Sequence, residues 1–494
     1  MSSTDHRKRT KIVATIGPAT QHPGMLRAMI RAGMDVARIN FSHGDLETHA
    51  RNIATIRRLA AEENAVVAIM ADLQGPKLRL GTLLVEPVEL TEGDRVTLTA
   101  ADRLDPENPF IIPFPHGDVL RDFKVGDRLL IDDGQIEMVV QAKTSSGVTA
   151  EVVTGGLLYS RKGVSVPDTT LTLSSITDDD RAHVKFALEQ GVDYIAMSFV
   201  RSADDLRELR WLMRHLNGDA ALIAKIEKAE AIANFDAILE QSDGIMVARG
   251  DLGVETPAEQ VPVYQKNIIR RCNEAGRPVI TATQMLNSMI DNPRPTRAEA
   301  SDVANAIFDG TDAIMLSGET AVGKYPLQAV EMMVRIAQIA EEYMLSRKEL
   351  DFGKLSAEAL HADRRRSVPA AISHVTSQIA QMLDARLIVA STYSGYTARR
   401  VARERPSTPI LATTPNRVTY HRLALVWGVT PILVDEFKTI DEMIRVAVDK
   451  AQALQLVKQD DLLVIIGGVP FGVGGQTNFL KVLRVGDLDN AQAP

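Results

Sequence analysis

The sequence predicts an α/β protein with a (β/α)8 barrel, a β-rich lid domain inserted into the barrel, and a C-terminal open α/β domain. Two patterns indicate this fold class. Eight short apolar runs alternate with segments of helical periodicity, and the alternation breaks once for a stretch of short strands and turns. The length agrees, because 494 residues with 45% apolar content suit about three globular domains.

The eight barrel strands are expected near residues 11, 35, 65, 192, 221, 244, 278 and 312. Runs such as KIVATIG and ALIAKIE are almost continuously apolar, which is typical of parallel strands buried on both faces. Segments such as DDLRELRWLMRHL place apolar residues at helical spacing between the strands. Eight β/α units favour a TIM barrel over an open doubly wound sheet, and we assign residues 1–72 and 168–346 to it.

The inserted domain is expected over residues 73–167. Turn sequences interrupt short alternating strands there, namely TEGD at 91–94, KVGD at 124–127, DDG at 132–134 and TSSG at 144–147. Because this stretch follows the third barrel strand, it would emerge at the C-terminal mouth of the barrel. Barrel active sites lie at that mouth, so we predict a lid.

The C-terminal domain is expected over residues 347–494, after a polar stretch. Four strands are predicted there, RLIVAST, PILATT, PILV and LLVIIGG, separated by helical segments. This alternation is typical of a small open α/β sheet.

Composition excludes several classes of protein. A net charge of −8 lacks the basic surplus of a generic nucleic-acid binder. No apolar run approaches the roughly 20 residues of a membrane span, and Pro18 interrupts the first apolar run too early for a signal peptide. The single cysteine, Cys272, cannot form an internal disulfide, which favours a reducing compartment. We expect a cytoplasmic protein with neither a membrane nor a nucleic-acid partner.

Charged residues end two neighbouring strands. Lys225 and Glu227 share one face of their strand, and Asp251 follows the next strand beside Gly250. Two carboxylates at one rim suit Mg²⁺, with Lys225 as a second cation. This set suits a reaction in which negative charge develops on a phosphoryl group or an enolate. Taken alone, the Lys-x-Glu pattern is more often a structural ion pair.

Other strand ends add polar candidates. Thr283 ends the strand near residue 278, and the strand near residue 35 runs into Arg38, Asn40, Ser42 and His43. The segment GETAVGK at 318–324 has the spacing of a P-loop, but Tyr325 replaces the required Ser or Thr. It also follows the last strand, so we reject a P-loop.

Long blocks of the chain resemble the pyruvate kinase family. They are ARINFSHG, ADLQGPKLR, SRKGVSVP, AKIEKAEAI, VARGDLGVE and the stretch from TATQMLNSMIDNPRPTR to MLSGETAVGKYP, in family order over nearly the whole chain. The resemblance implies Mg²⁺-dependent transfer of the phosphoryl group of phosphoenolpyruvate to ADP, giving pyruvate and ATP in the last step of glycolysis. It also implies a homotetramer.

The resemblance implies roles for individual residues. Lys225 matches the catalytic lysine that stabilises the transferring phosphoryl group and the enolate, and Glu227 and Asp251 match the Mg²⁺ ligands. Thr283 is expected near the proton delivered to the enolate carbon, and Arg38 grips the phosphoryl group. The positions that hold phosphoenolpyruvate match Arg38, Gly250, Asp251 and Thr283. The positions around the nucleotide match Asn40, His43, Arg79 and Lys162, the last from the lid, so that closure would complete the site.

One departure from the family concerns K⁺. The positions that bind K⁺ in many members match Asn40, Ser42 and Asp72, plus a threonine where this chain has Leu73. Many members also carry an acid where this chain has Lys77. Leucine offers no side-chain oxygen, whereas the Lys77 ammonium supplies a fixed positive charge. We expect an enzyme that needs Mg²⁺ but no K⁺, with neutral drift as the alternative.

The third domain is expected to regulate. The loop STYSGYTARR precedes a helix and carries Ser391, Thr392, Ser394, Gly395 and Thr397. Hydroxyls and backbone N–H groups at a helix N-terminus form an anion site, although ordinary N-capping uses the same residues. Because the loop matches the family's sugar-phosphate loop, the resemblance implies a phosphorylated effector. The loop at 467–475 lacks a basic residue, which favours a monophosphate sugar or nucleotide over a bisphosphate.

Two other functions would use parts of this pattern. A barrel lyase or aldolase acting on pyruvate-like enolates would use Mg²⁺ on similar carboxylates but would need neither the lid nor Arg79 and Lys162. A metabolite-binding regulator could be built on a decayed enzyme scaffold, but the intact set of Lys225, Glu227 and Asp251 argues against decay.

Overall fold

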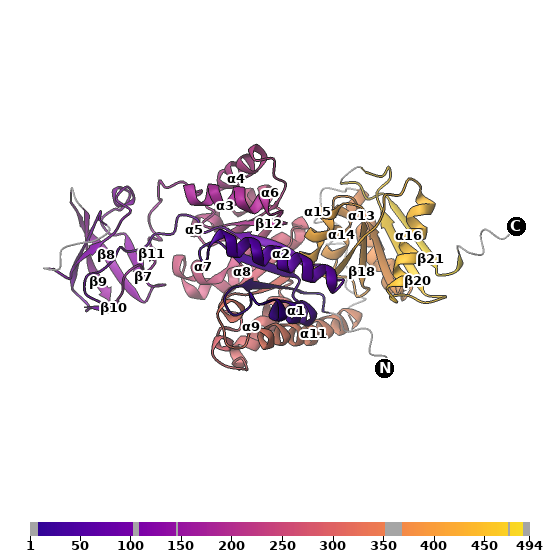
Figure 1. Cartoon of the computed structure of the whole chain (residues 1–494), viewed down its shortest axis with the longest axis horizontal. Coiled ribbons are helices and arrows are strands. Elements are labelled where there is room, and N and C mark those ends of the chain that lie inside the picture. The colour runs from indigo at the N-terminus through magenta and orange to yellow at the C-terminus, as the bar shows by residue number, and fades with distance from the viewer. Residues whose placement is uncertain (1–7, 102–107, 145–146, 351–367, 473–474, 488–494) are drawn as a thin grey trace.

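Three bodies lie in a row along the molecule (Figure 1). The computed structural model describes residues 8–101, 108–144, 147–350, 368–472 and 475–487. A small β domain stands at one end, a helix-wrapped barrel lies in the middle, and an α/β domain stands at the other end. The lid and the C-terminal domain therefore contact opposite ends of the barrel.

Eight parallel strands close the central barrel in the order β1-β16-β15-β14-β13-β12-β3-β2. All eight predicted strands are present, and the predicted fold class is confirmed. Their bounds are β1 (Lys11–Ile16), β2 (Val36–Asn40), β3 (Ala68–Asp72), β12 (Tyr194–Met197), β13 (Ala221–Ile226), β14 (Gly244–Ala248), β15 (Val279–Ala282) and β16 (Ala313–Leu316). Burial on both faces explains their continuous apolar character.

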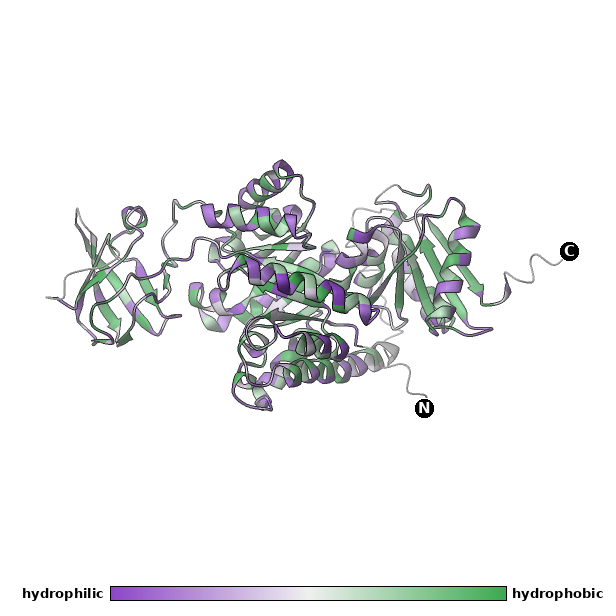
Figure 2. Cartoon of the chain, in the orientation of Figure 1, coloured by the Kyte–Doolittle hydropathy of each residue, from purple (hydrophilic) through white to green (hydrophobic). Residues whose placement is uncertain are grey.

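Helices surround the barrel and turn their polar faces outward (Figure 2). Local sequence sets where they begin: Thr177 and Thr296 form capping boxes with acids three residues on, at the starts of α3 and α9. The helices are α1 (Pro23–Ala32), α2 (Leu46–Glu62), α3 (Asp178–Glu189), α4 (Ala203–His215), α5 (Ala229–Ala233), α6 (Phe235–Gln241), α7 (Arg249–Glu255), α8 (Val261–Ala275), α9 (Arg297–Phe308), α10 (Gly318–Ala321) and α11 (Pro326–Leu350).

The β-rich unit lies in sequence between β3 and β12, as expected for an insertion. It has its own core around Phe114 and Phe123, both fully buried. A six-stranded sheet has the order β11-β7-β8-β9-β5-β6, and β10 pairs with β4. The strands are β4 (Val88–Leu90), β5 (Arg95–Thr99), β6 (Ile111–Pro113), β7 (Arg128–Ile131), β8 (Ile136–Lys143), β9 (Gly147–Thr154), β10 (Gly156–Leu158) and β11 (Val164–Ser165).

The C-terminal domain has one strand more than we predicted. Its sheet has the order β19-β18-β17-β20-β21, and the unpredicted β21 (Phe479–Arg484) pairs antiparallel at the edge. The other strands are β17 (Leu387–Ser391), β18 (Ile410–Thr414), β19 (Val429–Leu433) and β20 (Leu462–Gly467), with helices α13 (Val368–Met382), α14 (Tyr396–Arg403), α15 (Arg417–Arg422) and α16 (Ile440–Ala453). Helix α11 continues to Leu350, past the border predicted at residue 346, and the other predicted borders stay predictions.

The C-terminal domain closes the N-terminal end of the barrel. A 3₁₀ turn (Leu423–Leu425) places Ala424 and Leu425 among the side chains of the barrel interior. At the first residues of two strands, Lys11 Nζ donates to the carbonyl of Val429 at 2.8 Å, and the Tyr194 hydroxyl donates to the carbonyl of Arg422 at 2.5 Å. The opposite, C-terminal end of the barrel stays open toward the lid.

Candidate active site

Four of the candidate residues form one buried ion network at the C-terminal mouth. Lys225 Nζ lies 2.9 Å from Glu227 Oε1 and 3.1 Å from Asp72 Oδ1. Arg38 Nε lies 2.6 Å from Asp72 Oδ2. These residues come from β2, β3 and β13, so closure of the barrel brings together side chains far apart in sequence. The Lys-x-Glu pair is therefore part of a larger alternating network.

The network keeps Asp72 and Lys225 charged despite burial. Burial opposes ionisation of Asp72, but the Arg38 and Lys225 charges outweigh it and hold its pKa below the usual range. Burial would likewise lower the pKa of Lys225, yet Asp72 and Glu227 raise it above the ordinary value. Burial raises the pKa of Glu227, and the nearby Asp251 raises it further. A cation beside Glu227 and Asp251 would relieve that repulsion.

Three contacts that we did not predict hold the network in place. Lys225 Nζ donates to Ser198 Oγ at 2.7 Å, and Arg38 Nη1 donates to Thr15 Oγ1 at 2.9 Å. The backbone N–H of Phe199 donates to Glu227 Oε2 at 2.8 Å. Ser198 follows the apolar strand β12 directly, so its position at a strand end was the available sequence signal.

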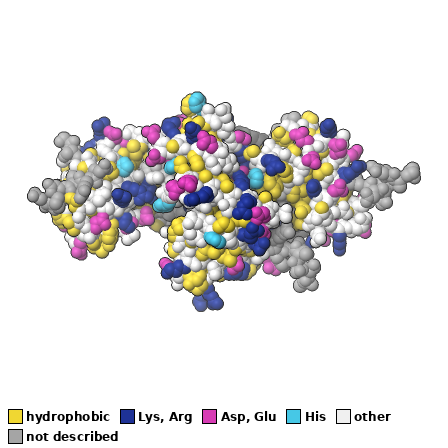
Figure 3. All heavy atoms as spheres, viewed as in Figure 1, with side chains coloured by type: hydrophobic (Ala, Val, Ile, Leu, Met, Phe, Trp, Pro, Cys, Tyr) yellow, Lys and Arg dark blue, Asp and Glu magenta, His cyan; other side chains and the backbone are white. Residues whose placement is uncertain are grey.

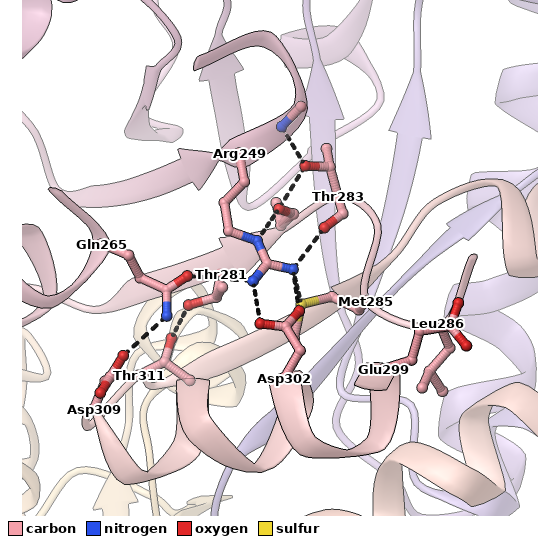
Figure 4. A network of polar contacts seen from close by, with 12 residues as sticks. Arg249, Gln265, Thr281, Thr283, Met285, Leu286, Glu299, Asp302, Asp309 and Thr311 are labelled. Atoms are coloured by element: carbon pink, nitrogen blue, oxygen red, sulfur yellow. Dashed lines mark hydrogen bonds and ion pairs between the residues drawn. The ribbon is translucent and has the colours of Figure 1, made fainter. Parts of the chain in front are cut away.

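Thr283 and the start of α7 form the neighbouring wall (Figure 4). The backbone N–H of Gly250 donates to Thr283 Oγ1 at 2.8 Å, and this hydroxyl donates to the carbonyl of Ala282 at 2.7 Å. Thr283 has φ of 68° and Gln284 has φ of 54°, a left-handed conformation that residues other than glycine seldom adopt and β-branched residues such as Thr283 least of all. Thr283, Gly250 and Asp251 thus meet as the sequence predicted.

A cleft of about 870 Å³ lies in front of this wall. Asp251, Thr283 and Lys77 line it, together with Asp133 from the lid. Among the described residues, Asp251 has neither a hydrogen-bond nor an ion-pair partner, so its carboxylate is available to a ligand. With the buried Glu227 it offers the hard oxygen ligands that a divalent cation prefers, and water or substrate oxygens would complete its coordination.

The proposed nucleotide residues are spread over barrel and lid. Lys162 Nζ lies 2.8 Å from Asp132 Oδ2 of the lid, and Arg79 Nη1 donates to the carbonyl of Arg161 at 3.1 Å. Asn40 Oδ1 accepts from the backbone N–H of Ser42 at 3.2 Å, and His43 is exposed. In the described ranges, no hydrogen bond or ion pair joins the lid pair to the barrel pair.

Leu73 and Lys77 mark the departure from the family's K⁺ positions that the sequence comparison indicated. The Leu73 side chain is buried, and Lys77 is half-buried beside the cleft. Across the described chain, the Lys77 ammonium has no hydrogen-bond or ion-pair partner, so its charge is not neutralised by a neighbouring carboxylate.

Four of the five predicted effector residues, all but Gly395, line a separate cavity of about 260 Å³ in the C-terminal domain. They are Ser391, Thr392, Ser394 and Thr397, and Glu436, Phe437 and Phe471 also line it. The N-cap of α14 is Gly395, which has no side chain, so these hydroxyls do not cap the helix as the alternative required. Thr392 is buried and has no side-chain partner within the described residues. The cavity-lining residues that the structure describes include no lysine or arginine.

Fold and site together define a class of enzyme. It is a (β/α)8-barrel enzyme with a buried lysine and carboxylates at the barrel mouth, a lid over that mouth and a separate α/β domain at the other end. Such a site stabilises negative charge that develops during reaction. No helix in the described ranges is long and apolar enough to span a membrane.

Comparisons with known proteins identify the family. The family model "Pyruvate kinase, barrel domain" matches residues 7–330, and "Pyruvate kinase, alpha/beta domain" matches residues 370–483. A pyruvate kinase from Geobacillus stearothermophilus is 47% identical, with 98% of this chain and 81% of the relative covered. One from Agrobacterium vitis is 44% identical over 99% of both chains. The chain belongs to the pyruvate kinase family and is a phosphotransferase.

Proposed function

We propose that this enzyme transfers the phosphoryl group of phosphoenolpyruvate to ADP, giving pyruvate and ATP. The observation that carries the proposal is the buried network of Arg38, Asp72, Lys225 and Glu227 beside Asp251, whose carboxylate has no partner among the described residues. Cleavage of the P–O bond of phosphoenolpyruvate leaves an enolate, and the transferring group carries negative charge. Lys225 and Arg38 are charged, buried donors suited to stabilise both.

Each remaining residue has one proposed task. Arg38 grips the phosphoryl group, and Gly250, Asp251 and Thr283 hold phosphoenolpyruvate. Thr283 lies near the proton that the enolate carbon receives to become pyruvate. Two bonds fix its hydroxyl, one from Gly250 and one to Ala282, which supports a positioned role.

Mg²⁺ is the proposed metal, held by Glu227 and Asp251. When bound, it would neutralise phosphate charge and polarise the phosphoryl oxygens. The raised pKa of Glu227 and the unpartnered Asp251 carboxylate support a cation at this point. No group of three or more His, Cys, Asp or Glu side chains arranged for a metal occurs among the described residues, so substrate and water would supply the other ligands.

The lid is proposed to complete the nucleotide site. Asn40 and His43 would contact the nucleotide from the barrel, and Arg79 and Lys162 from the side of the lid. Lys162 would exchange Asp132 for a phosphate as the lid closes and excludes water.

Potassium is proposed to be unnecessary. Lys77 would supply the charge that K⁺ provides elsewhere in the family, in a region where Leu73 gives no oxygen ligand. Its lack of a carboxylate partner in the described chain supports this assignment.

A phosphorylated effector is proposed for Ser391, Thr392, Ser394, Gly395 and Thr397, of which all but Gly395 line the cavity. The Thr392 hydroxyl, which has no side-chain partner among the described residues, supports an anion there. The absence of lysine and arginine from the described lining favours a monophosphate. A homotetramer in the cytoplasm is proposed as well. The exposed apolar side chains of Ile339 and Met382 suit contacts between subunits.

The test is pyruvate formation from phosphoenolpyruvate and ADP with Mg²⁺. Lys225→Met should lower turnover by about 10³-fold or more, because a buried charge opposite the developing enolate is lost. Lys185→Met removes an exposed lysine of α3 and should leave turnover unchanged. Release of pyruvate by C–C cleavage of a 2-oxo acid, without turnover of phosphoenolpyruvate and ADP, would favour the lyase or aldolase alternative. No turnover of either kind by the unaltered enzyme would favour the regulator.

A further inference from the structure

Arg249 is a buried cation of the site with no role so far. It is the first residue of α7, directly before Gly250 and Asp251, and its side chain is only 12% exposed. Its guanidinium does not point into the ion network of Lys225. Instead it reaches back to the end of the neighbouring strand β15 (Figure 4).

The guanidinium holds the turn that carries Thr283. Arg249 Nη2 donates to the carbonyl of Thr283 at 2.9 Å, and Nε lies 3.4 Å from the carbonyl of Ala282. These two carbonyls flank Thr283 in the chain. Because Thr283 and Gln284 both adopt positive φ, the turn costs conformational energy and persists only where neighbouring groups hold it.

An acid on α9 fixes the guanidinium in turn. Both carboxylate oxygens of Asp302 lie 2.8 Å from Arg249, one from Nη1 and one from Nη2. Gln265 Oε1 accepts from Nη1 at 3.3 Å, and Gln265 Nε2 donates to Asp309 Oδ2 at 3.0 Å. The planar guanidinium can bind the carboxylate and the carbonyls at once, whereas a lysine ammonium is a single point donor.

Arg249 therefore joins two parts of the substrate wall. Its backbone begins the helix that carries Gly250 and Asp251, and its side chain pins the turn that carries Thr283. The bond from Gly250 N–H to Thr283 Oγ1 spans the same junction. If the side chain released the turn, the Thr283 hydroxyl would lose its orientation although no group that contacts substrate had been removed.

We propose that Arg249 is a positioning residue that orients the Thr283 hydroxyl for delivery of the proton to the enolate carbon. The proposal rests on the proposed function, specifically on the role of Thr283. It assigns to Arg249 an effect on protonation and on kcat, with little effect on nucleotide binding.

The test compares Arg249→Lys with the unaltered enzyme by two measurements. The first is kcat and KM for pyruvate formation. The second is deuterium incorporation into the methyl group of pyruvate in D2O, which isolates the proton step. Both kcat and the exchange rate should fall by about 10²-fold, as expected for a misplaced reacting group, while KM for ADP stays within about twofold. The matched control is Arg210→Lys, which makes the same change on α4 in an ion pair with Asp243.

A double-mutant cycle separates positioning from general destabilisation. In a Thr283→Val background the Arg249→Lys change should lower kcat by less than about threefold. The hydroxyl that Arg249 orients is already absent there, so its orientation no longer matters. Asp302→Asn should give an intermediate loss, and it serves if Arg249→Lys fails to fold. Normal exchange in Arg249→Lys and Asp302→Asn, or losses that multiply in the cycle, would overturn the proposal. Absence of pyruvate formation by the unaltered enzyme would instead overturn the proposed function.

Discussion

Single residues decide the electrostatics of this site. Asp72 lies between Arg38 and Lys225 and pairs with both, and Glu227 supplies the second negative charge, so two cations can lie side by side. Asp251 has no such partner in the described chain and remains available to a ligand. The same distinction separates Lys162, which is paired with Asp132, from Lys77, which has no ion-pair partner in the part of the chain that the structure describes.

Lys77 leads to a prediction about monovalent cations. The unaltered enzyme should turn over equally, within about twofold, in KCl and in tetramethylammonium chloride at matched ionic strength, because the ammonium replaces the ion. Lys77→Glu should lose activity in the tetramethylammonium salt and regain part of it in KCl. Lys124→Glu makes the same charge change on an exposed lid residue and should match the unaltered enzyme. A large loss for the unaltered enzyme without K⁺ would contradict the proposal.

His49 leads to a prediction about pH and stability. Burial lowers the pKa of this imidazole, a bond to the His43 backbone and the Asp45 charge oppose the effect, and His183 adds to it. Below about pH 6.5 the unfolded chain binds a proton that the folded chain rejects. The free energy of unfolding should therefore fall as pH drops through that value toward the lower folded pKa.

Urea unfolding at pH 7.5, 6.5 and 5.5 measures this slope. His49→Gln should show a shallower loss of stability than the unaltered protein, because one titrating group is gone. His215→Gln changes an exposed imidazole on α4 and should keep the original slope. An unchanged slope in His49→Gln would contradict the assignment.

At the scale of elements, the loop after β12 anchors the segment of residues 168–176, by which the chain returns from the inserted domain to the barrel. Arg201 Nη1 donates to the carbonyl of Leu171 at 2.6 Å, and Nη2 donates to the carbonyl of Leu173 at 2.7 Å and to Ser175 Oγ at 2.9 Å. These bonds fix the base of the segment while the lid sheet beyond it has a core of its own. In the proposed lid function, this base is the point about which the inserted domain would move.

Arg201→Ala should release this anchor. Deuterium uptake of backbone amides over residues 168–176 should rise, because the carbonyls of Leu171 and Leu173 lose their guanidinium donor and the segment is no longer held. Stability should fall by about 1–3 kcal/mol. KM for ADP should rise with it, since the lid contributes to the proposed nucleotide site. Arg207→Ala, in an exposed pair with Asp204, should leave all three quantities unchanged. Unchanged uptake over 168–176 would contradict the anchor.

At the scale of the whole molecule, the C-terminal domain plugs the barrel. Thr419 Oγ1 of α15 donates to the carbonyl of Tyr393 in the proposed effector loop at 2.8 Å. Helix α15 leads directly into the 3₁₀ turn that places Leu425 in the barrel interior. A continuous packed segment thus connects the effector cavity to the barrel that carries the active site. The face drawn in Figure 3 carries both acidic and basic side chains.

Leu425 leads to a prediction about regulation. Titration with sugar monophosphates and nucleoside monophosphates should shift the half-saturation for phosphoenolpyruvate with at least one of them. Leu425→Ala should weaken that shift without abolishing effector binding measured by calorimetry, because the packed connection is loosened. It should also cost about 2–5 kcal/mol of stability as a buried cavity. Leu454→Ala, at an exposed position, is the control. If no compound shifted the half-saturation, the effector proposal would fail.

Much of this protein was determined by sequence alone. The eight barrel strands, the inserted β domain and the candidates at strand ends follow from local periodicity, because alternation and helical spacing depend on near neighbours. The edge strand β21 was missed, since four of its six residues are half-buried and only Leu483 is buried. Helix α11 extends past the border predicted at residue 346, because the polar sequence at its end resembles a linker.

Only the tertiary structure decided which faces meet. Asp72 between Arg38 and Lys225, Ser198 on Lys225, Arg249 on the Thr283 turn and Leu425 inside the barrel are all contacts between distant segments. Local spacing sets the face on which a side chain lies, but its partner depends on the closure and register of the whole barrel. The sequence therefore determined the residue types at the mouth, and the folded chain decided which of them are neutralised and which remain available to substrate.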